Sequence, residues 1–99
     1  MTSSTASPSD ETLVARARQG DEQAFRNLVE RYESTVAATV IGMLGAGPEA
    51  EDVGQETFIR FYRALHQFRG EAAVGTYLTR IAINLSLNAL KRRRRRRLY

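Results

Sequence analysis

The chain has 99 residues, 15 of them Lys or Arg and 11 Asp or Glu, and its formal net charge is +4 at pH 7. Seven consecutive basic residues at 91–97 carry the excess of positive charge, because the other 8 basic and 11 acidic residues give a net charge of −3. The basic end predicts an anionic partner, either nucleic acid or an acidic membrane. The absence of Cys excludes disulfides and thiolate metal sites, and the lack of a long apolar run or signal segment predicts a soluble cytoplasmic domain.

The first half of the chain predicts two helices. Residues 1–9 are mostly Ser, Thr and Ala without apolar periodicity, so we expect a disordered leader there. Asp10 is predicted to cap a short first helix that ends at Gly20, and Asp21 is predicted to cap the next. From residue 25 to residue 44, apolar side chains recur every three or four positions, which predicts a long amphipathic helix.

The second half predicts two more helices. A third is expected to begin at Pro48, after a glycine-rich break, and to run to about Leu65. The fourth is expected to start at residues 72–74, and its apolar stripe ends at Leu90. Like charges four positions apart in residues 91–97 oppose helix formation, so we expect a frayed end there. The predicted fold is all-α, a compact bundle of about four helices with a basic C-terminal extension.

The residues needed for most catalytic chemistry are missing. His66 is the only histidine, and without Cys it cannot build a metal cluster of the usual kind. No glycine-rich segment follows a strand or precedes Lys-Ser or Lys-Thr, so there is no phosphate-cradling loop. We therefore expect a protein that is not an enzyme and that uses no cofactor and no metal.

Two groups of polar residues predict binding surfaces. Asp52, Gln55 and Glu56 share one face of the third helix, which is either a solvated charged face or a docking face. The loop and the fourth helix combine rings, guanidinium groups and amides, which can stack on bases and bond to their edges. These residues are Phe68, Arg69, Tyr77, Arg80, Asn84 and Asn88. The alternative is that Phe68 and Tyr77 belong to the core.

Several short motifs, in order along residues 11–97, resemble region two of the extracytoplasmic-function sigma factors, which are small initiation factors of bacterial RNA polymerase. The motifs are Leu13-Val14, Gly20-Asp21, Ala24-Phe25, Tyr32, Ala50-Glu51-Asp52-Val53-Gly54-Gln55-Glu56-Thr57-Phe58, Ala64-Leu65, Phe68-Arg69-Gly70-Glu71, Thr76-Tyr77-Leu78, Arg80-Ile81-Ala82 and Asn84.

The resemblance implies a function and a set of site residues. Region two docks on the β′ clamp helices of the polymerase core, and the residues implied here are Asp52, Gln55, Glu56, Arg60 and Arg63. It also recognises and melts the promoter minus-ten element by holding the non-template single strand with a flipped base. The DNA-binding residues implied are Ala64, Phe68, Arg69, Gly70, Tyr77, Arg80, Ile81, Asn84 and Asn88, with Lys91, Arg92 and Arg93 along the phosphates. An anti-sigma factor is a further candidate partner; no membrane is expected.

The sequence also departs from the family. Of the aromatic residues usual around Thr76, only Tyr77 is present, and Gly54 stands where an aliphatic residue is usual. We assign region two to residues 10–97 and a tail to residues 98–99, and expect no helix-turn-helix region four domain. The alternative function is an arginine-rich nucleic-acid-binding module without polymerase contact. A basic helix on a membrane surface is a third interpretation.

Overall fold

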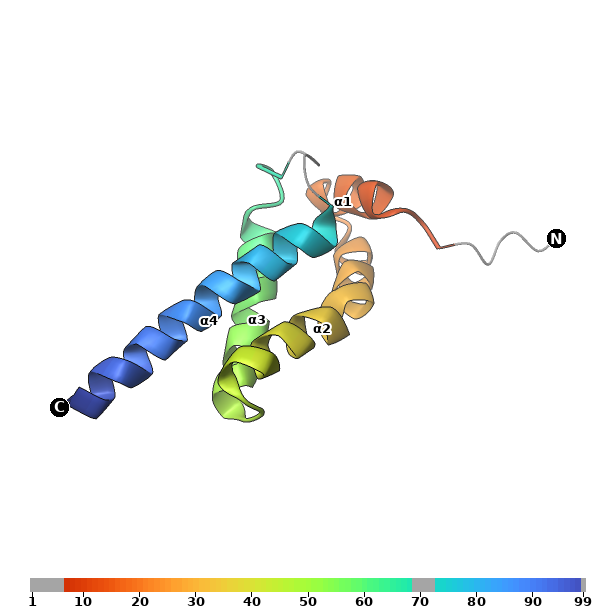
Figure 1. Cartoon of the computed structure of the whole chain (residues 1–99). Helices are drawn as coiled ribbons and strands as arrows, with labels where there is room; N and C mark the ends of the chain where they lie inside the picture. Colours follow the sequence, from red (N-terminus) through yellow and green to blue (C-terminus); the bar gives the residue numbers. More distant parts are fainter. Residues whose placement is uncertain (1–6, 69–72, 99) are drawn as a thin grey trace.

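The computed structural model describes residues 7–68 and 73–98, and in this part of the chain all regular structure is helical. The helices are α1 (Asp10–Arg18), α2 (Glu22–Leu44), α3 (Pro48–Arg63) and α4 (Val74–Leu98). Figure 1 shows α2, α3 and α4 side by side, with the short α1 against the first half of α2. The predicted all-α bundle is confirmed.

Polar side chains cap the first two helices. Asp21 accepts a hydrogen bond from the backbone N–H of Ala24 at 3.1 Å, as predicted for the start of α2. The cap of α1 was wrong by one residue: Ser9, not Asp10, accepts from the N–H of Thr12 at 3.1 Å. The expected leader thus ends in an ordered cap, and residues 1–6 of it lie outside the described residues.

Glycine and proline make the sharp connection between α2 and α3. Gly45 and Gly47 have φ of 83° and 149°, backbone conformations that other residues adopt only with strain. Pro48 is the first residue of α3, as predicted, where its missing N–H has no helical partner to lose. α3 ends at Arg63 rather than near Leu65, because Ala64 and Leu65 turn back onto the last carbonyl groups of the helix.

The core lies where the four helices meet. Its centre is Phe61, which is fully buried and whose ring lies 5.9–6.0 Å from the rings of Phe25, Phe68 and Tyr77. Burying aromatic rings of this size is worth a few kcal/mol each, so this cluster dominates the local stability. The predicted apolar faces of all four helices contribute to the core.

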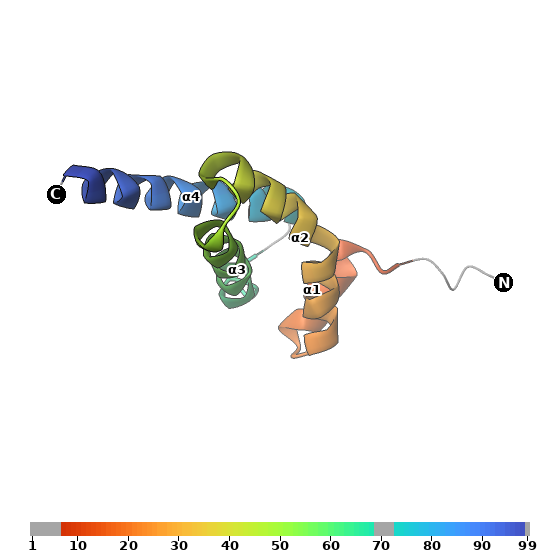
Figure 2. The same cartoon turned by 90° about the horizontal axis from the view of Figure 1, so that it is seen from below.

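The last helix continues through the basic run, so the expectation of a frayed end was wrong. α4 is one unbroken helix from Val74 to Leu98. Its C-terminal end lies clear of the other helices in both views (Figures 1 and 2). Repulsion between like charges is offset by the favourable position of cations at a helix C-terminus and by contacts of Arg93 with α2 and α3. Leu98, assigned to a tail, belongs to this helix.

Candidate partner and nucleic-acid interfaces

The polar residues predicted on α3 lie together on its solvent side. Asp52, Gln55, Arg60 and Arg63 are exposed and Glu56 is half-buried. Arg60 and Glu56 form an ion pair at 3.5 Å between Nε and Oε2. Both groups are well hydrated, so the pair contributes little stability and leaves the two side chains available to a partner.

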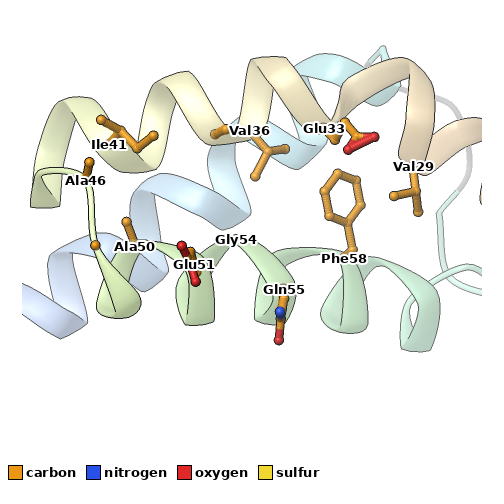
Figure 3. A pocket seen from close by; sticks show the side chains of 12 residues that line it. Val29, Glu33, Val36, Ile41, Ala46, Ala50, Glu51, Gly54, Gln55 and Phe58 are labelled. Atoms are coloured by element: carbon orange, nitrogen blue, oxygen red, sulfur yellow. The ribbon is translucent and has the colours of Figure 1, made fainter.

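A groove between α2 and α3 runs beside this polar face, and the sequence analysis did not predict it. Its volume is about 470 Å³, and apolar side chains such as Val29, Val36 and Phe58 line it together with Gln55. In Figure 3 the ring of Phe58 points from α3 toward α2, while Gln55 points away from α2. Gly54 contributes no side chain, which leaves the groove open at the middle of α3.

A second hollow of about 450 Å³ continues the groove. It shares Val29 and Phe58 with the first and adds Ile59 and Tyr62, which is 53% exposed. Exposed apolar side chains bordered by polar residues are a feature of protein-binding surfaces. The sequence held a signal for this second hollow, though not for the groove, since Ile59 and Tyr62 fall outside the apolar stripe of α3.

The outer face of α4 carries the predicted base- and phosphate-contacting residues. Arg80, Asn84, Asn88 and Lys91 are exposed, and steps of three and four residues place them along one side of the helix. Arg92 is also exposed, and Ile81 is half-buried at the edge of the core. The structure therefore brings amide and cationic donors into one line, as the sequence spacing predicted.

Residues 64–68, which follow α3, pack against the bundle. Phe68 is only 8% exposed and its ring lies 4.9 Å from that of the half-buried Tyr77. The Leu65 carbonyl accepts a hydrogen bond from Nε of Arg18 at 2.7 Å, which ties this segment to α1. Phe68 is thus a core residue, the alternative that the sequence left open.

The remaining predicted residues fall in different surroundings. Ala64 caps the end of α3 and is half-buried. Arg69 and Gly70 lie outside the described residues. Arg93, predicted to follow the phosphates, is half-buried and already bonds to Glu49 and to the carbonyl of Leu44.

The first turn of α4 rests on Tyr32 of α2. A Cβ at Gly75 would lie 3.0 Å from Cε1 of that ring, so glycine allows the close approach. The hydroxyl of Tyr32 donates a hydrogen bond to the carboxylate of Asp10. Burial, followed by the hydrogen bond to Asp10 and the charge of that carboxylate, raises the pKa of Tyr32 to about 12 against an opposing effect of Arg31.

Neither a metal-binding cluster nor a membrane-spanning helix is found in the part of the chain that the structure describes. Residues 7–68 and 73–98 contain no group of three or more His, Cys, Asp or Glu placed to hold a metal ion. None of their helices is both long enough and apolar enough to cross a membrane. The described residues therefore form two surfaces. One combines the polar face of α3 with the apolar groove between α2 and α3. The other is the outer face of α4, which carries amide and basic side chains.

Comparison with known proteins assigns the chain to a family. Residues 28–96 match the family model of sigma-70 region 2. The chain is 45% identical over 87 residues to the RNA polymerase sigma-H factor of Pseudomonas aeruginosa. It is 46% identical over 87 residues to the ECF RNA polymerase sigma-E factor of Escherichia coli K12. Each alignment covers 88% of this chain and 45% of the relative, so the chain spans about half the length of these curated relatives.

A solved structure matches over nearly the whole chain. It is the NMR structure of the complex formed by an engineered region 2 of sigmaE in complex with GTAAAA. The match has a TM-score of 0.84 at 40% identity and covers 97% of each chain. The resemblance of the sequence to region two of the extracytoplasmic-function sigma factors is confirmed.

Proposed function

Because this chain belongs to the sigma-70 region 2 family, we propose that it is the promoter-recognising part of a bacterial transcription initiation factor. In this role it docks on the RNA polymerase core and recognises and melts the promoter minus-ten element. It acts by binding in the bacterial cytoplasm rather than by catalysis, with no cofactor, and an anti-sigma factor is a further proposed partner.

One observation carries the DNA half of this proposal. Asn84 and Asn88 lie exposed on α4, in line with Arg80 and Lys91, on a fold that matches a neighbour solved with GTAAAA. Amides and guanidinium groups along a helix can bond to the edges of unstacked bases, and basic residues further along can follow the phosphates. Arg69, Gly70, Ile81 and Ala64 are proposed to complete the base site, with Phe68 and Tyr77 supporting it from the core.

The polymerase half of the proposal rests on α3. Asp52, Gln55 and Glu56, with Arg60 and Arg63 nearby, form a polar surface on the solvent side of the helix. The adjoining apolar groove offers side chains that a protein partner would remove from water. We assign this combined surface to the clamp helices of the β′ subunit.

The experiment that tests docking is capture of this chain by a purified β′ clamp-helix fragment. The double variant Gln55→Ala/Glu56→Ala should lose capture while keeping its helical circular dichroism. A matched control, Gln23→Ala/Glu30→Ala, removes a similar exposed pair from α2 and should be captured like the wild type. Equal capture of both variants would remove Gln55 and Glu56 from the docking site.

The alternative, an arginine-rich module without polymerase contact, is favoured by the exposed basic residues of the α4 extension. It predicts that deletion of residues 91–97 abolishes binding to single-stranded DNA whatever the sequence. The sigma-factor proposal predicts that the deletion weakens binding but leaves a preference for GTAAAA over a scrambled strand. A competition titration with the two strands separates these functions.

A further inference from the structure

Arg93 connects the basic extension of α4 to the rest of the bundle. Its Nε donates to Oε1 of Glu49 at 2.7 Å, and Nη2 lies 2.6 Å from the same oxygen. Nη2 also donates to the carbonyl oxygen of Leu44 at 2.7 Å. The side chains of Arg93 and Glu49 are each 30% exposed, so the contact is partly shielded from water.

The two partners of Arg93 lie on either side of the turn between α2 and α3. Leu44 is the last residue of α2, and its carbonyl belongs to the negative end of that helix, where a cation is favourable. Glu49 is the second residue of α3, where a carboxylate is favourable in turn. The guanidinium group of Arg93 therefore joins α4 to α2 and α3. Its positive charge lies at the C-terminal end of α2, and the negative charge of Glu49 lies at the N-terminal end of α3, so both charges are favourably placed.

This contact lies beyond the point where α4 leaves the core. Ala89 is the last buried residue of the helix, and Leu90 is half-buried. Among residues 91–98, Arg93 is half-buried and the others are exposed. Arg96 comes no closer than 4.0 Å to Glu49 and is 69% exposed. Arg93 is therefore the main contact between the extension and the rest of the bundle.

The proposed DNA face depends on the direction of the extension. Lys91 follows Asn84 by seven residues, or about two helical turns, and Arg92 follows Asn88 by four. An unbroken helix keeps these cations in line with the amides, whereas a frayed end would let them scatter.

We infer, on the basis of the proposed function, that Arg93 is a positioning residue: through Glu49 and Leu44 it holds the α4 extension so that Lys91 and Arg92 meet the phosphates of the strand bound at Asn84. In this arrangement the Nε and Nη2 groups of Arg93 serve Glu49 and Leu44 within the chain instead of the phosphates.

The two roles of Arg93 predict opposite effects of removing Glu49. If Arg93 binds phosphate, Glu49 competes with the DNA, and its loss frees the guanidinium and raises affinity. Loss of any acidic group near DNA also raises affinity by reducing repulsion. If Arg93 positions the extension, the loss of Glu49 lowers affinity although it makes the protein more positive.

The experiment measures the dissociation constant for a single-stranded DNA that contains GTAAAA and extends past it. Glu49→Ala and Arg93→Ala should each weaken binding by about threefold, and the double variant should be no weaker than either single variant. Arg93→Lys keeps the charge but cannot bridge both partners, so it should behave like Arg93→Ala. Glu51→Ala removes a similar, exposed charge from the same turn of α3 and should not weaken binding.

Hydrogen exchange provides a readout that needs no DNA. Backbone amides of residues 94–97 should exchange faster in Glu49→Ala and Arg93→Ala than in the wild type or Glu51→Ala. DNA binding by Glu49→Ala that equals or exceeds wild-type affinity would overturn the inference, and so would unchanged hydrogen exchange. If Glu49→Ala does not fold, both measurements are made on Glu49→Gln. Failure of the wild type to prefer GTAAAA over a scrambled strand would instead overturn the proposed function.

Discussion

Tyr32 and Asp10, on different helices, are joined by a hydrogen bond from the tyrosine hydroxyl to the carboxylate. Arg31 adds an ion pair to Asp10 at 2.8 Å between Nη1 and Oδ1. The ring of Tyr32 also supports the first turn of α4 at Gly75. This one side chain therefore connects α1 and α2 to the helix proposed to read DNA.

Tyr32→Phe should lower the free energy of unfolding by about 1 kcal/mol at neutral pH, since it removes the hydrogen bond to Asp10. Because the folded-state pKa of Tyr32 is raised to about 12 from 10.0, its contribution is complete below pH 10 and is lost as the pH rises through 12. In strong alkali the order should reverse, with the wild type less stable than Tyr32→Phe, because its phenolate would be partly buried beside the carboxylate of Asp10. Urea titrations across this pH range provide the measurement, and Tyr62→Phe, at an exposed ring, serves as the control.

Ser86→Ala should stabilise the domain by about 1 kcal/mol. Among the described residues, Ser86 is fully buried and its Oγ has no hydrogen-bond partner, so the hydroxyl has lost water without compensation. Thr57 is equally buried, but its Oγ1 donates to the carbonyl of Val53 at 2.8 Å. Thr57→Val should therefore give no such gain. A lower denaturation midpoint for Ser86→Ala than for the wild type would contradict this account.

Gly54→Ala should also stabilise the domain, by up to about 1 kcal/mol, because alanine favours the helix interior. A Cβ at Gly54 would meet no atom within 4 Å, so the gain carries no steric cost. Gly47 is the matched control: its Cβ would be equally free, but φ of 149° makes any side chain strained, and Gly47→Ala should destabilise. Thermal melts of the two variants should shift in opposite directions.

Asn84→Ala and Arg92→Ala should affect DNA binding in different ways. Loss of the Asn84 amide should lower affinity for GTAAAA about tenfold and affinity for a scrambled strand much less, as expected for a contact to a base. Loss of Arg92 should weaken both strands alike and reduce the slope of log affinity against log salt by about 0.7. Salt titrations with both strands measure the two effects; equal losses for Asn84→Ala would argue against base recognition.

Local patterns predicted the fold well because they are strong and sustained. The three- and four-residue spacing of apolar side chains identified each helix and its buried face, and Pro48 and Asp21 marked starts that the structure confirms. The cap of α1 was misplaced because Ser9 and Asp10 are equally good caps by residue type. Arg31 and Tyr32, more than twenty residues away in the sequence, donate hydrogen bonds to the carboxylate of Asp10, and Ser9 caps the helix instead.

Tertiary contacts explain what the sequence did not reveal. Repulsion within the basic run predicted fraying, and only the fold brings Arg93 to Glu49 and Leu44. Phe68 could be a stacking ring or a core ring by its type alone, and its contact with Phe61 decides for the core. The groove between α2 and α3 could not be predicted, because the apolar stripe does not tell how completely Phe58 is covered. The assignment of each surface to its partner stays a prediction.

The continuity of α4 has a consequence for how this segment can vary. One residue inserted after Leu90 would rotate everything beyond it by about 100° and advance it by about 1.5 Å. Because residues 91–97 are all basic, the shift would bring Arg92 to the place of Arg93 opposite Glu49, and basic residues would still follow it along the helix. Substitutions among the exposed arginines change only the local charge. The uniform composition of the basic run therefore makes its contact with Glu49 insensitive to a shift of one residue along the helix.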